Sequence, residues 1–282
     1  MCLTSAARFL VGPVSAPALL ALSLLAAAPA VAADGGASTA DVAAKLAAHK
    51  AQYSLTLSET RGGDIVASQG TMTYEVTDAC DAWATNQRLQ MTLTNRDGQN
   101  IEMVSDYATW ESKDGLRMRF HLRQTTDDAV TEEDSGEASL DGTGEAGTVH
   151  YAAPQDKTLP LPAGTLFPMM HTAHIIAAAE NGEKFLNVPL FDGTGPKGAQ
   201  DTSVVVLGWD KPAPTPFPIL SALPSGRMRI AFFDRGKDAV QPDYEVGMRY
   251  WENGIADDLK MDFGDFVMNG KLKELDVPKP HC

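Results

Sequence analysis

The chain has 282 residues, of which 44% are hydrophobic and 21% are charged. This balance is too polar for a multi-span membrane protein and too apolar for a disordered chain. The formal net charge of -14, from 37 acidic and 23 basic residues, argues against nucleic acid as a partner, because binding through phosphates needs clustered lysine and arginine.

The first 33 residues have the pattern of an export signal. Arg8 is their only charged residue, an apolar run rich in Ala and Leu covers residues 9–27, and Ala30-Val31-Ala32-Ala33 fits the small-x-small cleavage rule. A membrane anchor is the alternative, but two prolines inside the run and the small-residue exit favour cleavage. We therefore expect a signal peptide over residues 1–33, cleaved near Ala32-Ala33, and a mature chain over 34–282 that has no transmembrane segment.

Cleavage would leave two of the three cysteines, Cys80 and Cys282, because Cys2 lies in the signal. In an oxidising compartment an even pair of cysteines usually forms a disulfide. Two free thiols are the alternative, and no CxxC spacing points to a redox site. We predict a Cys80–Cys282 disulfide that ties the last residue of the chain to an early strand.

The mature chain begins with a helical pattern over residues 37–53. Ser38 and Asp41 are spaced for a capping box, and Val42 and Leu46 mark an apolar stripe at helical spacing. The sequence therefore predicts an N-terminal helix.

After this helix, apolar residues recur with a period of two. Leu89, Met91 and Leu93, for example, alternate with polar residues, which is typical of half-buried strands. Alternating runs cover residues 53–60, 64–77, 83–93, 101–111, 116–123, 146–152, 184–191, 202–208, 227–234, 244–251 and 256–267, with hairpin turns at Asp97-Gly98, Asp114-Gly115 and Asn253-Gly254. The pattern predicts a mainly β fold, with about 12–14 strands in a large curled antiparallel sheet, an open barrel or β-spiral.

Two segments depart from this pattern. Residues 127–147 are acidic and glycine-rich, and we interpret their charge run as a solvated loop, although residues 129–140 could contain a strand. Residues 210–226 contain five prolines, which predicts a stiff irregular loop. Because strand patterns resume unchanged beyond both segments, we expect a single domain over residues 34–282.

One internal helix is predicted near residues 165–181, with Gly182 as its stop. His171 and His174 lie three residues apart on it and could share a face, where with the preceding Met169 and Met170 they suggest a metal such as copper. A metal centre needs more ligands at defined geometry, and no HExxH motif or histidine-rich tract supplies them. We interpret the two histidines as capping and packing residues, keep metal binding as the alternative, and predict no cofactor.

The sequence contains no recognisable catalytic constellation. It has no GxSxG elbow, and the paired carboxylates of a glycosidase meet only in the fold, so spacing does not reveal them. We therefore predict that the protein is not an enzyme.

Several strings nevertheless resemble a known family, the EipB-like cell envelope integrity family. They are Gly70-Thr71-Met72-Thr73-Tyr74-Glu75-Val76, then Cys80-Asp81-Ala82-Trp83, then the stretch from Leu159 to Pro168 with His171 and His174, and Leu190-Phe191-Asp192-Gly193. The resemblance extends from about Ala40 to Cys282. It implies a protein of the Gram-negative periplasm that supports envelope integrity. It also implies a spiralling, partly open β fold, distantly similar to the lipoprotein carriers, which bind acyl chains in a hydrophobic cavity.

The resemblance also implies a disulfide between the positions of Cys80 and Cys282, and it offers no catalytic residues to carry over. We therefore expect a non-enzymatic periplasmic protein whose partner is a lipid, a lipoprotein or another hydrophobic envelope ligand. One alternative is an interaction scaffold that docks periplasmic proteins on open sheet edges or acidic loops. A cell-wall hydrolase with a site assembled from distant residues is the other.

Overall fold

The computed structural model describes residues 36–236, 241–280 and 282. The expected signal peptide, with its cleavage near Ala32-Ala33, lies outside these residues. Gly36–Cys282 form one compact unit. Within the described part of the chain, the helices are too short or too polar to cross a membrane.

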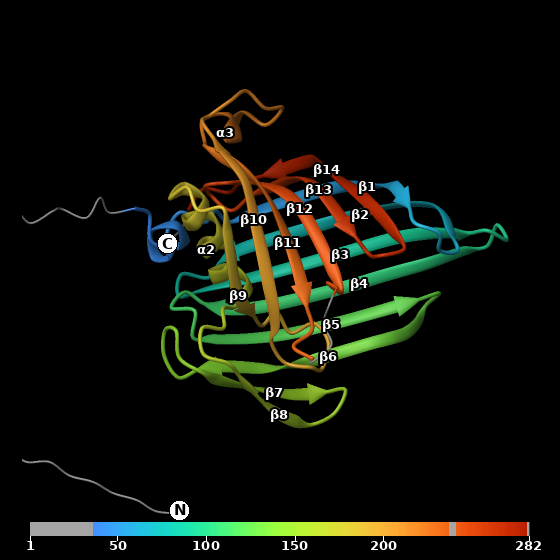
Figure 1. Ribbon diagram of the computed structural model, residues 1–282, viewed down its shortest axis with the longest axis horizontal. Helices are drawn as coiled ribbons and strands as arrows, with labels where there is room; N and C mark the ends of the chain where they lie inside the picture. Colours follow the sequence, from blue (N-terminus) through green and yellow to red (C-terminus); the bar gives the residue numbers. More distant parts are fainter. Residues whose placement is uncertain (1–35, 237–240, 281) are drawn as a thin grey trace, which may run out of the picture. The chain divides into compact units, whose positions relative to one another are not determined.

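The described residues form one sheet of fourteen antiparallel strands, built from two meanders (Figure 1). The first meander contains β1 (His49–Thr60), β2 (Ile65–Asp78), β3 (Ala82–Asn95), β4 (Asn100–Ser112), β5 (Arg117–Thr126), β6 (Ala129–Leu140), β7 (Gly147–Ala153) and β8 (Lys157–Leu161). The second contains β9 (Phe185–Leu190), β10 (Gln200–Asp210), β11 (Ser225–Phe233), β12 (Tyr244–Trp251), β13 (Ala256–Asp262) and β14 (Phe266–Asp276). Because β1 pairs with β14, the two meanders are continuous, and β8 and β9 are the edges of the sheet.

The strands form where apolar and polar residues alternate in the sequence. In β5, Met118, Phe120 and Leu122 are buried while the residues between them are exposed, so one face of the strand packs inward. The predicted hairpin turns are present, and their glycines have the positive φ that such turns require, for example 78° at Gly98 and 81° at Gly254. The predicted mainly β fold with a large antiparallel sheet is confirmed.

The sheet curls so that its second half faces its first. In Figure 1, β9–β12 pass in front of β2–β5, and one apolar core joins side chains of β1–β3 to side chains of β10–β14. The two edges approach each other without a ladder between them, since Leu166, which follows β8, makes a single parallel bridge to Leu190 of β9. The sheet is therefore open, with an interior between its two halves.

Three helices accompany the sheet in the described residues: α1 (Thr39–Ala43), α2 (Pro168–Glu180) and α3 (Pro218–Ser221). The Ser38 capping box is present at α1, but the expected helix over 37–53 is wrong in extent, because β1 begins at His49 and pairs with β2 and β14 on its two sides. The longest, α2, lies inside the predicted 165–181 range, and its Ile175 and Ile176 are fully buried in the curl. The proline-rich segment contains the one-turn α3.

Three further expectations need correction. The acidic run is not a solvated loop, because most of it lies in β6, where Asp134 is 1% exposed. The run over 256–267 is two strands, which turn at Gly264 with φ of 86°. Sequence reasoning missed β8, which contains Pro160; a proline is tolerated there because β8 is an edge strand and needs no second ladder.

Candidate ligand-binding cavity

The interior of the curl contains a cavity of about 300 Å³. Its walls are the inner faces of β1–β3 on one side and of β12 and β13 on the other, and α2 and the segment that follows α1 close one end. None of the described residues that line it is Asp, Glu, Lys or Arg. An uncharged concave site of this size is typical of binding sites for small apolar molecules.

Four methionines give the cavity much of its apolar surface: Met72, Met169, Met248 and Met261. Methionine is unbranched and polarisable, so its side chain adapts to ligands of different shape. Because these residues come from β2, α2, β12 and β13, the lining exists only when both halves of the sheet and α2 are in place.

The polar groups of the lining are neutral. Burial lowers the pKa of His49, so its ring is uncharged at neutral pH, and its Nδ1 lies 2.8 Å from the carbonyl oxygen of Ala47. The Tyr53 hydroxyl donates to the carbonyl oxygen of Ala256 at 2.8 Å, and burial raises the pKa of this hydroxyl far above its usual value. The side-chain amide of Gln87, on the inward row of β3, has no hydrogen-bond partner among the described residues.

A buried carboxylate holds α2 against this wall. Glu111 of β4 has no exposed surface, and its oxygens accept the backbone N–H groups of Met169 at 2.8 Å and Met170 at 3.0 Å. The helix needs this cap, because its N-cap residue, Phe167, makes no side-chain capping bond. Burial raises the Glu111 pKa to about 7, even though the two N–H donors lower it. Glu111 thereby positions Met169 in the cavity wall.

Sequence reasoning did not single out Glu111 or Gln87. The alternating pattern did contain a signal, since Glu111 has the same strand parity as Ile101 and Met103 and so lies on the apolar row of β4. A charged residue on an apolar row indicates a partner inside the fold. The partner itself, the start of α2, is 58 residues away in the chain and could not be identified from spacing.

The two histidines considered as metal ligands instead join elements of the fold. The Nε2 atom of buried His171 lies 3.0 Å from the Thr202 hydroxyl on β10, and desolvation lowers its pKa to about 3. The Nδ1 atom of His174 lies 3.1 Å from the Thr39 hydroxyl, which ties α1 to α2. No group of three or more His, Cys, Asp or Glu residues suited to a metal ion occurs in the described part of the chain.

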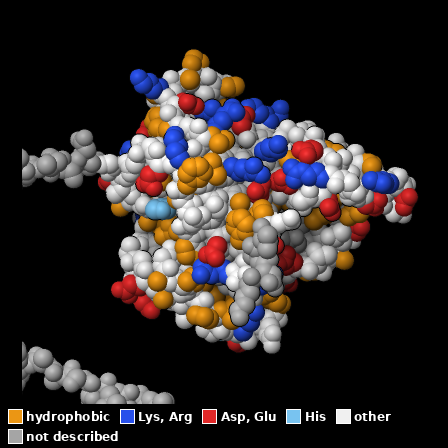
Figure 2. Space-filling model, viewed as in Figure 1, with side chains coloured by type: hydrophobic (Ala, Val, Ile, Leu, Met, Phe, Trp, Pro, Cys, Tyr) orange, Lys and Arg blue, Asp and Glu red, His pale blue; other side chains and the backbone are white. Residues whose placement is uncertain are grey.

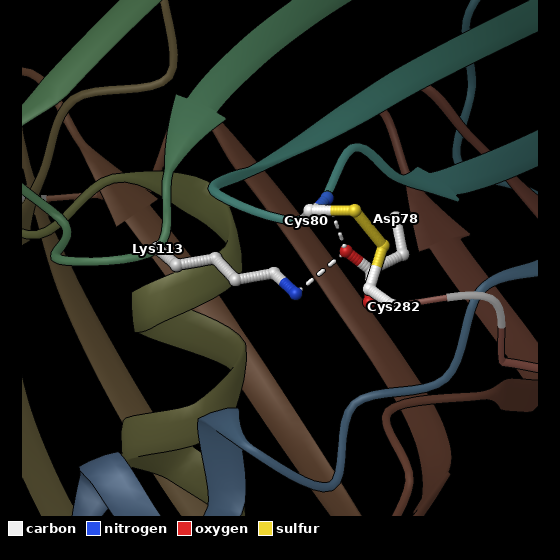
Figure 3. Close-up of a disulfide and its surroundings, with 4 residues drawn as sticks. All are labelled: Asp78, Cys80, Lys113 and Cys282. Carbon is white, nitrogen blue, oxygen red and sulfur yellow. Dashed lines mark hydrogen bonds and ion pairs between the residues drawn. A yellow bond between two sulfur atoms is a disulfide. The ribbon is translucent and has the colours of Figure 1, made fainter.

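Cys80 and Cys282 form a disulfide with Cα atoms 5.4 Å apart (Figure 3). The Asp78 carboxylate accepts the Cys80 N–H at 2.9 Å and lies 2.6 Å from the Lys113 ammonium, so the β2–β3 turn is held from two sides. The bridge ties the segment after β14 to this turn. Since β2 and β14 both pair with β1, the disulfide fastens together the strands on either side of β1.

Three larger hollows of the described residues lie elsewhere, and each has charged side chains in its lining. One of about 780 Å³ crosses the outer face of β11–β14, where Lys and Arg side chains gather on the face shown in Figure 2 and lie among carboxylates. A second, of about 810 Å³, lies between α1, α2 and the C-terminal tail, and Lys113 and Asp114 line it. A third, of about 520 Å³, lies over β1–β4, and Glu102 lines it. None of the three has the uncharged lining of the interior cavity, which is therefore the stronger candidate for an apolar ligand.

Comparison with known proteins points to one family. A family model described as EipB-like matches residues 40–279. The cell envelope integrity protein EipB of Brucella abortus (strain 2308) is 33% identical over 251 residues, which cover 86% of this chain and 88% of that protein. A crystal structure of a beta-barrel-like protein from Brucella abortus, assigned to a domain of unknown function, superposes with a TM-score of 0.75 at 31% identity. The superposed residues make up 83% of this chain and 99% of the Brucella chain.

Proposed function

The chain belongs to the EipB-like family, and we propose that it is a non-enzymatic periplasmic protein that supports cell envelope integrity by holding a hydrophobic envelope ligand. One observation carries the ligand-binding part: an interior cavity of about 300 Å³ without a charged side chain. A concave space of this size, lined mainly by apolar side chains, suits a small apolar ligand. An acyl chain of a lipid or lipoprotein matches the lining.

The family supports the location and the role. The relative's name ties that protein to envelope integrity, and an exported protein explains why a disulfide would persist between Cys80 and Cys282. The buried ionisable groups beside the cavity have structural partners: Glu111 caps α2, and His171 contacts Thr202. We therefore assign no reaction to them.

Native mass spectrometry of protein purified without detergent, before and after mixing with an envelope lipid extract, tests the proposal. Leu89 is half-buried and lines the cavity, so Leu89→Trp should project an indole into the space and reduce bound lipid at least about tenfold. The matched control is Leu207→Trp, on a residue that is 67% exposed on the outer face of β10, and it should bind like the wild type. Equal binding by the two variants, or no bound species in any sample, would contradict the proposal.

A protein-interaction role has its own supporting observation. Phe185 on the edge strand β9 is 74% exposed and lies beside β10, where Leu207 is also exposed, and hydrophobic side chains gather over these strands in Figure 2. An exposed apolar patch next to a free sheet edge is typical of docking surfaces. Crosslinking in envelope fractions, compared between the wild type and Phe185→Ser, tests this second role; an unchanged crosslink pattern would argue against it.

A further inference from the structure

We infer that the cavity selects a single aliphatic chain of about twelve carbons that ends in an uncharged polar group, such as a hydroxyl, amide or carbonyl. The inference rests on the proposed function and specifies its ligand class. It follows from the volume of the cavity, from the charge of its lining, and from the placement of its polar groups.

The volume limits the length of the chain. An apolar protein cavity of about 150 Å³ takes up one benzene molecule, which has six carbons. The cavity here has about 300 Å³, twice that volume, so it encloses about twelve carbons. One saturated chain of this length fills the space, and the second chain of a membrane diacyl lipid would lie outside it.

The lining excludes a charged end group inside the cavity. A buried ion is strongly destabilised unless an opposite charge or several hydrogen bonds compensate it. None of the described lining residues is acidic or basic, and His49, the one lining side chain that titrates near neutral pH, is kept neutral by burial. The nearby Glu111 carboxylate is already engaged with two backbone N–H groups. A carboxylate or ammonium end would therefore find no counter-ion.

The polar and apolar parts of the lining are separated along β3. Thr85 contacts Met169 of α2, with its hydroxyl 4.0 Å from the Sδ atom; Gln87 comes two residues later and Leu89 two after that. The cross-strand neighbour of Gln87 on β2 is Tyr74, whereas Leu89 pairs with Met72. The unpaired amide of Gln87 thus lies at the end of this row near α2, and Leu89 and Met72 lie farther from the helix. This order places the uncharged end of the ligand at Gln87 and its chain toward Leu89.

Isothermal titration calorimetry of the wild-type protein with primary alcohols, carboxylates and alkylamines tests the chain length and the end group. The ligands span about 6 to about 14 carbons, which brackets the twelve carbons that the cavity volume accommodates. Alcohol affinity should rise about fourfold per added methylene and level off near twelve carbons. The alcohol should bind at least about tenfold more tightly than the carboxylate or ammonium of the same length. Gln87→Leu should weaken dodecanol binding about three- to tenfold. The matched control Asn86→Leu, on the exposed outer row of β3, should not.

The outcomes separate the inference from the proposed function. Equal affinity for dodecanol and dodecanoate, or affinity that keeps rising through the longest chain, would overturn the inference and leave hydrophobic ligand binding in place. The same holds if Gln87→Leu and Asn86→Leu bind dodecanol like the wild type. If no alcohol of any length binds, the proposed function fails and the inference fails with it.

Discussion

Replacing Glu111 with glutamine should change how stability depends on pH. The wild-type carboxylate is fully buried and accepts two N–H groups from the first turn of α2. Glutamine has nearly the same shape and keeps one oxygen acceptor, but its NH₂ group faces the second N–H donor and cannot accept from it. The variant should therefore lose about 1 kcal/mol of capping, and it should no longer titrate at this site.

The size and sign of the pH effect follow from the pKa values. Burial raises the Glu111 pKa from 4.5 to about 7 in the folded protein, so the folded state holds this proton more tightly than the unfolded state. Its stabilising contribution is fully present below about pH 4.5 and is lost as the pH rises through about 7, after which it stays constant. A shift of this size corresponds to about 3 kcal/mol.

Urea unfolding, followed by tryptophan fluorescence between about pH 5 and about pH 8, measures this effect. The difference in unfolding free energy, wild type minus Glu111→Gln, should fall across this pH interval by most of the about 3 kcal/mol. The other titrating groups are common to both proteins, so their contributions cancel in this difference. Glu137→Gln changes an exposed carboxylate on β6 and serves as the control. A difference that stays constant for Glu111→Gln, or that falls equally for Glu137→Gln, would refute the reasoning.

Three further predictions concern the scaffold. Cys282→Ser opens a link that spans 202 residues, so unfolding free energy should fall by up to about 5 kcal/mol, and a reducing agent should lower the urea midpoint of the wild type but not of the variant. Gly193→Ala should lower the thermal midpoint more than Gly195→Ala. Both positions have positive φ, but only the first places a Cβ 2.4 Å from the Phe120 ring, and equal losses would contradict this reasoning. Tyr53→Phe leaves a half-buried carbonyl of β13 without this donor and should cost about 1 kcal/mol in urea unfolding; wild-type stability would contradict it.

Sequence reasoning succeeded where the determinants are local. The alternating rows of the strands, the positive-φ glycines of the hairpins and the Ser38 capping box involve residues a few positions apart, so their chemistry is visible in the sequence. The same reasoning failed where pairing partners are distant. An alanine-rich stretch after α1 favours a helix by propensity, yet β1 starts at His49 because β2 and β14 both offer it a ladder.

The sequence by itself therefore determined a chain of alternating strands with one buried helix, and an even pair of cysteines beyond the expected signal peptide. Tertiary structure decided that β1 joins β14, that β12 and β13 face β1–β3, and that Glu111 meets the start of α2. It also decided that the space between the two halves stays uncharged. A side chain's strand parity follows from its neighbours. The opposite wall of the cavity comes from distant residues, such as Ala256, which lies 203 positions from Tyr53, and their placement depends on the packing of the whole sheet.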